Sequence, residues 1–137
     1  MAGGANYVLD KGYKASGALT QFLAVKFSGT TYDTVAPISG LTDAPLGICQ
    51  ETISAGDATN GRVCDIRILG ISRAVAGGVI NPGDRVKVDA TGKLIAVPGV
   101  AGTNDKVVGI SLGAPTVTND IFDVLLTPGV TNNTAVS

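Results

Sequence analysis

The chain has 137 residues, a length that favours a single domain. Its 10 basic and 11 acidic residues leave a net charge of −1 and form no basic cluster, which argues against a surface that follows a nucleic-acid backbone. No run approaches the roughly 20 apolar residues of a membrane span, and the N-terminus lacks the apolar core of a signal peptide, so we expect synthesis and folding in a cytoplasm.

The chain is poor in charge and rich in glycine. Hydrophobic residues make up 45% of it and charged residues 15%, and there are 19 glycines. Charged side chains account for about 25% of an average globular domain. Because so little polar surface is available to cover the fold, we expect some apolar surface to face a partner.

Residues 1–16 are predicted to form a flexible N-terminal arm. Gly3-Gly4 is followed by one short apolar run, Tyr7-Val8-Leu9. A free arm with such a run is suited to strand addition at the exposed sheet edge of a partner. A second interpretation stays open, because the same run can form an edge strand of its own domain.

A single β domain is predicted from residue 17 to residue 129. Residues 18–28 fit either a helical face or a strand, and we prefer the strand because Gly17 and Gly29 bound the segment closely. Further strands are expected at 34–35, 46–50, 63–68, 85–89, 93–97, 107–112 and 120–126, with a turn-rich loop at 54–61. The polar residues 130–137 are expected to form a flexible tail.

The centre of the chain carries the densest pattern of strands and turns. From Cys64 to Ile68 the even-numbered residues are apolar and the odd-numbered ones are charged, which places the apolar set on one face of a strand. After Gly70 the parity changes, and Leu69 and Ile71 become the apolar pair. A glycine at such a slip predicts a bulge or a strand that passes from one sheet to another.

No long helix fits the sequence. Glycine costs about 1 kcal/mol and proline about 3 kcal/mol in a helix interior, and both recur along the chain. The longest segment without either is 116–127, and its second half has a strand pattern. Short strands at regular spacing predict an all-β fold, either a small β-sandwich or a β-barrel-like domain.

Four short motifs recur in the same order in the two halves of the chain. They pair Gly17-Ala18-Leu19 with Gly78-Val79-Ile80, Leu23–Lys26 with Val86–Asp89, Gly47-Ile48 with Gly109-Ile110, and Cys64–Ile68 with Phe122–Leu126, at offsets of 61, 63, 62 and 58 residues. A nearly constant offset predicts two pseudo-repeated β-units, each too small to bury its own face, that pack as one core.

Few residues suggest catalysis. The chain has no histidine, which removes the commonest general base and metal ligand. Ser111 lies in a G-x-S-x-G match, but a nucleophile elbow needs a following helix and a histidine. Asp65 and Asp123 hold equivalent repeat positions and could act as a carboxylate pair on a glycosidic bond, but charges on an outer strand face explain them better. We therefore expect no enzyme, no cofactor and no metal site.

Two cysteines, Cys49 and Cys64, are too few for a disulfide scaffold and, without histidine, do not make a zinc site. We expect both to be free and at least partly buried. A bridge between them would require their two strands to lie side by side.

An ordered set of turn and strand motifs spans nearly the whole chain, from about residue 6 to residue 126. It consists of Asn6-Tyr7-Val8-Leu9, Gly17-Ala18-Leu19-Thr20, Gly47-Ile48, Gln50-Glu51, Ser54-Ala55-Gly56-Asp57, Gly61-Arg62-Val63, Pro82-Gly83-Asp84, Thr91-Gly92 and Val108-Gly109-Ile110. This order resembles the small capsid cement, or decoration, proteins of tailed bacteriophages.

The resemblance implies a structural virion protein, not an enzyme, that binds the outer surface of the capsid and stabilises the expanded head. It implies the major capsid protein as partner and a homotrimer, while the charge and hydropathy patterns give no reason to expect a nucleic-acid or membrane partner. On the arm hypothesis, the residues that contact the capsid are Asn6, Tyr7, Val8 and Leu9. Another β-rich virion module, such as a tail, fibre or glycan-binding domain, stays open as the alternative.

Overall fold

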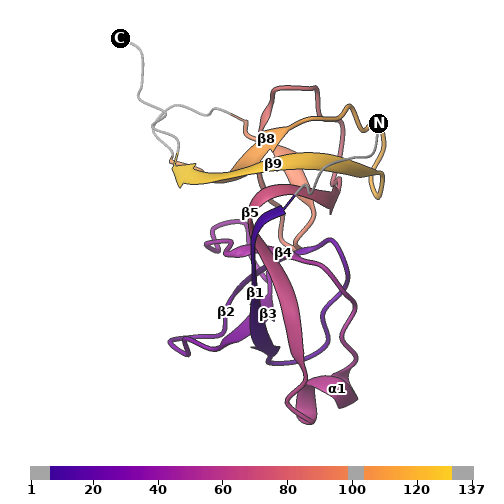
Figure 1. Ribbon diagram of the computed structural model, residues 1–137. Coiled ribbons are helices and arrows are strands. Elements are labelled where there is room, and N and C mark those ends of the chain that lie inside the picture. The colour runs from indigo at the N-terminus through magenta and orange to yellow at the C-terminus, as the bar shows by residue number, and fades with distance from the viewer. Residues whose placement is uncertain (1–6, 99–103, 131–137) are drawn as a thin grey trace.

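The computed structural model of the chain describes residues 7–98 and 104–130, and these residues are almost entirely β structure (Figure 1). The strands are β1 (Tyr7–Ala15), β2 (Ala24–Phe27), β3 (Thr34–Pro37), β4 (Gly47–Cys49), β5 (Val63–Val75), β6 (Arg85–Val88), β7 (Leu94–Ala96), β8 (Lys106–Ser111) and β9 (Ile121–Val130). One short helix, α1 (Ala55–Thr59), accompanies them among the described residues. The all-β prediction is therefore confirmed.

The first five strands close into a barrel. The described strands form one sheet in the order β1-β3-β2-β4-β5-β9-β8-β6-β7, and β1 also pairs with β5. Because β1 pairs with β3 along one edge and with β5 along the other, strands β1 to β5 form a closed ring. The β1–β3 pair is parallel, whereas the other pairs of the ring are antiparallel.

The remaining strands repeat this arrangement, which confirms the two predicted β-units. We define unit 1 as residues 7–69 and unit 2 as residues 70–98 with 104–130. The order β3-β2-β4-β5 in unit 1 matches the order β7-β6-β8-β9 in unit 2. The second half of β5 has the same place in unit 2 as β1 has in unit 1. It pairs antiparallel with β9, as β1 pairs with β5. Just after it, Ala76 forms a parallel bridge with Leu94, which matches the parallel pair of Ala15 with Val35.

The registers of the two units agree closely. Ile48 pairs with Arg67 in unit 1, and Ile110 pairs with Leu125 in unit 2. One predicted match was misaligned by two residues. Ala24 lies opposite Ile48, and Arg85 lies opposite Ile110, so β2 corresponds to β6 at an offset of 61 residues. The predicted offset of 63 came from aligning the alternating hydrophobic residues of the two strands. Because this alternation has a period of two, the alignment fits equally well when one strand is shifted by two residues.

Long strand β5 passes from unit 1 to unit 2 at Gly70, where φ is 107° (Figure 1). Of the two predicted alternatives, the bulge is confirmed and the change of sheet is wrong, because β5 stays in one sheet on both sides of Gly70; the predicted change of parity is also wrong. Ser72 is buried on the same parity as Cys64, and Leu69 and Ile71 lie on the opposite parity, with Leu69 39% exposed. The β1–β5 register slips by one residue on each strand around Leu69, so the two slips cancel and the alternation resumes unchanged.

The two units have separate cores that meet at a seam. The unit 1 core consists of Tyr13, Ala15, Leu19, Val25, Val35, Cys49, Ile53, Cys64 and Ile66. The unit 2 core also takes in Ala24, Ile38 and Ile48 from unit 1. Complete burial of a side chain such as Ile48 contributes about 1.5–3 kcal/mol, so the seam ties the units together.

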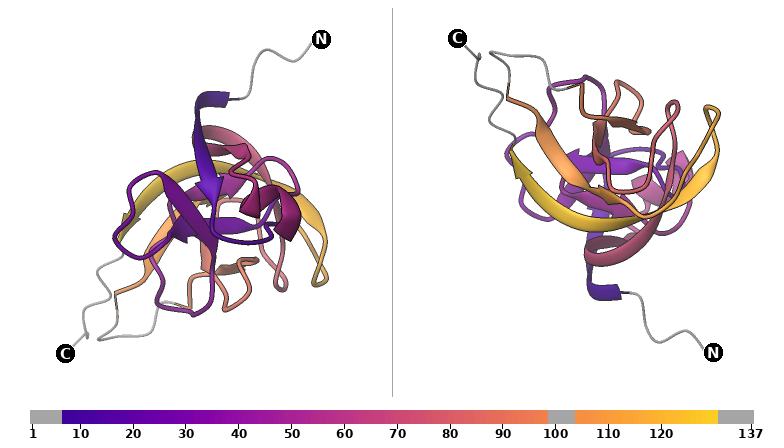
Figure 2. Two further views of the ribbon diagram at one scale, coloured as in Figure 1. Left: turned by 90° about the horizontal axis from the view of Figure 1, so that it is seen from below. Right: turned by 90° about the horizontal axis from the view of Figure 1, so that it is seen from above.

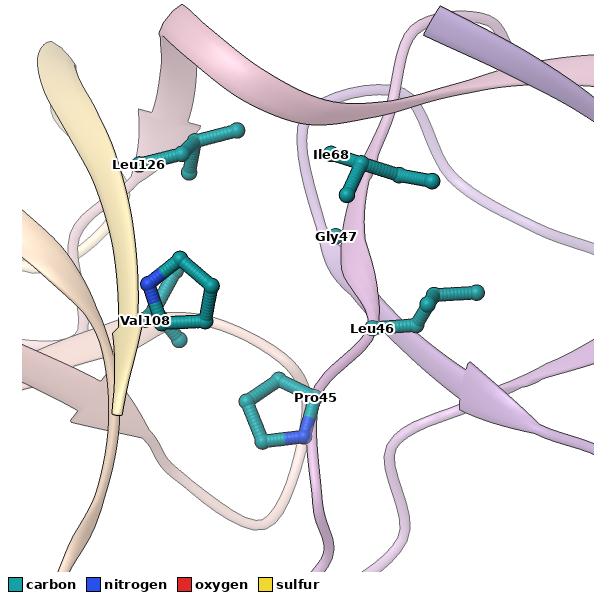
Figure 3. Close-up of a pocket in the computed structure, with 7 residues that line it drawn as sticks. Pro45, Leu46, Gly47, Ile68, Val108 and Leu126 are labelled. Carbon is teal, nitrogen blue, oxygen red and sulfur yellow. The ribbon is translucent and has the colours of Figure 1, made fainter. Parts of the chain in front are cut away.

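A small apolar crevice marks this seam (Figure 3). Pro45, Leu46 and Gly47 line it from unit 1, opposite Val108 and Leu126 from unit 2. Its volume of about 10 Å³ leaves room for no more than one water molecule. The crevice is therefore a packing feature and not a ligand site.

Two local predictions were wrong. Residues 7–15 of the predicted arm form β1, a strand of the barrel, so the edge-strand alternative holds for them, while residues 1–6 lie outside the described residues. The predicted loop at 54–61 contains α1, because the Ser54 hydroxyl accepts a hydrogen bond from the Asp57 backbone N–H at 3.0 Å and caps the helix. The predicted tail lies outside the described residues beyond Val130, which ends β9.

Substitution of the two repeated glycines should destabilise the fold. A methyl group at Gly47 would overlap the Arg67 carbonyl oxygen, and one at Gly109 would overlap that of Leu125. We expect Gly47→Ala and Gly109→Ala each to lower the free energy of unfolding by about 1–3 kcal/mol, measured by urea denaturation. Gly17→Ala is the control, because no heavy atom lies within 4 Å of its added carbon. Equal effects at all three positions would contradict the close approach of the strands.

Candidate functional site

The candidate capsid-binding residues lie at the start of β1. Tyr7 pairs with Gly70 and Leu9 with Leu69, which leaves Val8 as an extra residue in a bulge. Val8 is 72% exposed and Leu9 is 44% exposed. Asn6 lies outside the described residues. The structure thus brings Val8 and Leu9 together on an ordered strand, not on a free arm.

Side chains further along β1 hold it against the barrel. The Arg67 guanidinium donates to both carboxylate oxygens of Asp10, at 2.8 and 3.1 Å, in a half-buried ion pair. The Lys11 ammonium lies 4.5 Å from the centre of the Tyr13 ring, which packs edge to face on Phe27. These contacts fix the C-terminal half of β1, while its N-terminal end stands out from the body of the molecule (Figure 2).

One edge of β1 is largely free. On the side away from β5, only Lys14 and Ala15 pair with another described strand, β3. From Tyr7 to Tyr13, the described part of the chain supplies no strand partner for this edge. An unpaired edge offers backbone N–H and C=O groups to an incoming strand, and the exposed Val8 and Leu9 flank it.

Ser111 has no catalytic setting. It is 1% exposed at the end of β8, and its hydroxyl donates to the Gly113 carbonyl at 2.9 Å. The strand–turn–helix of a nucleophile elbow is absent from the described residues, where the only helix follows Ser54. The geometry therefore gives Ser111 a structural role in its loop.

Asp65 and Asp123 are on the outer faces of different units. Asp65 pairs with Gly12 across β1 and β5, and Asp123 pairs with Arg73 across β5 and β9. The described residues contain no group of three or more histidine, cysteine, aspartate or glutamate side chains that could hold a metal ion. Among those residues, α1 is also far too short to be a transmembrane helix, and no longer helix accompanies it.

The two cysteines face the interior of unit 1 on neighbouring strands. Cys49 of β4 pairs with Ile66 of β5, one diagonal step from Cys64. Both thiols are free and fully buried, which confirms that prediction. Burial raises the pKa of Cys49 and raises that of Cys64 to about 12, so neither has the thiolate character of a reactive cysteine.

One charged cluster fixes the loop that enters the seam. The Asp43 carboxylate accepts from the Lys26 ammonium at 2.8 Å and from the backbone N–H groups of Ser39 and Gly40 at 2.8 and 3.0 Å. The Lys26 contact, followed by these backbone bonds, holds the pKa of Asp43 well below its usual range. Asp43 thereby anchors the residues that lead into Pro45 and the crevice.

Comparison with known proteins shows the fold. No family model and no curated protein matches the chain. A solved structure, the N base of the head fibre protein gp8.5 of bacteriophage phi29, matches with a TM-score of 0.62 at 11% sequence identity. The match covers 94% of this chain and 98% of the phage protein. The two proteins therefore share one fold over nearly their whole length.

The sequence pointed to Tyr7-Val8-Leu9 and left an edge strand open as one alternative, but it did not show which strand β1 pairs with or how far its free edge extends. That edge depends on the pairing of Asp10 with Arg67, which lie 57 residues apart. No local pattern could join two such distant charges. The only signal of this site in the sequence is the short apolar run Tyr7-Val8-Leu9, whose strand partners the sequence does not reveal.

The buried Cys64 thiol should be almost inert in the folded protein. With a pKa of about 12, roughly one thiol in ten thousand is ionised at pH 8, so reaction with a chromogenic disulfide reagent should be very slow and should accelerate in urea. The free energy of unfolding should hold below pH about 9, the ordinary pKa, and fall as pH rises towards 12, because only the unfolded chain then loses the proton readily. Rapid labelling of the native protein would contradict the burial.

Proposed function

We propose that this chain is a structural protein of a phage virion that binds the outer surface of the capsid and stabilises the expanded head. The observation that carries the proposal is the shared fold with the base of a phage head fibre, over nearly all of both chains. The order of turn and strand motifs, which resembles capsid cement proteins, supports the same role. The major capsid protein is the proposed partner.

The free edge of β1 is the proposed capsid-binding site. A strand of the capsid protein would pair with the backbone of Tyr7 to Tyr13 and pack against Val8 and Leu9. Ordering a free arm costs about 1–2 kcal/mol per residue, but β1 is already ordered by its pairing with β5. Many copies on one shell would then hold firmly even if each single contact is weak.

A second candidate function is the base of a head fibre, because that is what the structurally similar phage protein is called. A fibre base also attaches to the head, but it carries a projecting structure. Electron microscopy of virions with and without this protein separates the two. Density that ends close to the shell favours a cement protein, and density that continues outward as a fibre favours a base.

The resemblance to cement proteins also implies a homotrimer. Light scattering of the purified protein should then give a mass of three chains of 13.7 kDa each, or of six chains where two trimers associate. A monomer or a dimer under all conditions would contradict a trimer preformed in solution.

A charge on the free edge should block capsid binding. We expect Val8→Lys to weaken binding to undecorated heads by at least about tenfold, because it replaces an apolar contact by a charge that must lose its water. Cosedimentation with heads measures the affinity. Val79→Lys is the matched control, since Val79 is 65% exposed on a loop of unit 2.

Both variants should keep the melting temperature of the native protein, because both side chains are largely exposed. If Val8→Lys binds heads as tightly as the native protein, the edge is not the site. If the native protein itself fails to bind, or bound protein does not raise the temperature at which heads release DNA, the proposed function is wrong.

A further inference from the structure

The outer face of the unit 2 sheet is unusually apolar. Its outward side chains on β5, β9 and β8, and directly after β8, include Ile71, Val75, Ile121, Leu125, Ile110 and Leu112. Of these, Ile121 is 52%, Leu112 47% and Leu125 37% exposed. An antiparallel sheet that faces water normally carries polar side chains on its outer face. An apolar outer face of this kind indicates contact with a partner.

Unit 1 provides an internal comparison, because three of the four corresponding positions discussed here carry a charged residue in unit 1. The Asp10–Arg67 ion pair of β1 and β5 occupies the place of the Ile71–Leu125 pair of β5 and β9. Two rows further along the strands, the pair Lys14–Val63 corresponds to Val75–Ile121, so a lysine stands in unit 1 where unit 2 has Val75. The fold therefore does not require apolar residues at these positions, and their presence in unit 2 needs another cause.

A second comparison indicates what kind of partner covers this face. Ile48 of unit 1 is completely buried because unit 2 packs over it. Its counterpart in unit 2, Ile110, is only partly buried beside Leu125. Within one chain, therefore, a unit of this same fold already covers the equivalent position.

The charges on the face are arranged to complement themselves. Three cross-strand rows lie side by side on β5 and β9: Ile71 with Leu125, Arg73 with Asp123, and Val75 with Ile121. Arg73 and Asp123 are exposed, and among the described residues their side chains form no ion pair with each other. The central row thus presents one positive and one negative charge between two apolar rows.

We propose that this face of β5 and β9 binds the same face of a second copy of the chain. A two-fold axis parallel to the strands, midway between β5 and β9, places β5 of one copy over β9 of the other. Arg73 then meets Asp123 of the second copy, and each apolar row meets an apolar row. No other partner needs to be invoked to match both the charges and the apolar rows, and the contact does not depend on capsid binding.

Charge reversal in purified protein tests this contact. We expect the native protein to associate through this face in sedimentation equilibrium, as two single chains or as two of the implied trimers. Arg73→Asp and Asp123→Arg should each dissociate at this contact at least about tenfold more readily, because like charges then face each other. Mixing the two variants should restore association, since each chain now meets the opposite charge on the other. Native mass spectrometry identifies the mixed assembly by its mass.

Asp65→Arg is the matched control, because it makes the same change on the outer face of unit 1 and should leave association unchanged. Restored association in the mixture also shows that both variants are folded. A native chain that remains monomeric, a trimer insensitive to both reversals, or a mixture that fails to associate would overturn the proposal. Because no capsid is present, these outcomes are distinct from failure of head binding.

Discussion

The structure depends on one strand, β5, that belongs to both units. Its first half has β1 on one edge and β4 on the other, since Arg67 pairs with residues of both. Its second half pairs with β9 and bridges β7 through the residue that follows it. Gly70 stands where the strand turns from one unit to the other, with a φ of 107° that favours glycine. Neither unit has a complete set of strands without β5, so we regard the two as one cooperative structure.

The two units keep the same backbone plan but present different surfaces. Close strand crossings at Gly47 and Gly109 hold the plan in both, because only glycine allows the backbones to approach so closely. The outer face of unit 1 carries the Asp10–Arg67 pair, whereas that of unit 2 carries Ile71 and Leu125. Unit 1 also keeps a free strand edge beside Val8. The chain thus has a free strand edge in unit 1 and an apolar outer face on β5 and β9 in unit 2, which suits a protein with two kinds of neighbour.

Much of the fold could be predicted from the sequence, because alternation and glycine punctuation are local signals. The strands around Ile48, Val86 and Val124 and the repeat at Gly47 and Gly109 follow from them. What failed were features set by distant contacts. Residues 7–15, predicted as part of a free arm, form a strand because they pair with β5. The predicted change in the parity of the buried residues of β5 does not occur, because one register slip on each strand near Leu69 cancels the other. Helix α1 was not predicted, because Gly56 disfavours a helix, whereas the Ser54 side chain caps its N-terminus and stabilises it. The sequence analysis left open an edge strand at Tyr7-Val8-Leu9, but the extent of the free edge depends on the distant β1–β5 pairing and could not be predicted.

Closure of the barrel by its first strand also has a consequence for how the chain folds. Asp10 and Arg67 are 57 residues apart, so β1 gains its main partner only after nearly all of unit 1 has been made. Contacts of such high sequence separation must overcome a large loss of chain entropy before they contribute stability, and proteins dominated by them fold slowly. During synthesis, only Lys14 and Ala15 of β1 can pair with β3 before β5 leaves the ribosome, and the rest of β1 has no strand partner until then. Until β5 is made, the unpaired part of β1 can therefore pair with a wrong strand, and this interval ends when β5 pairs with it.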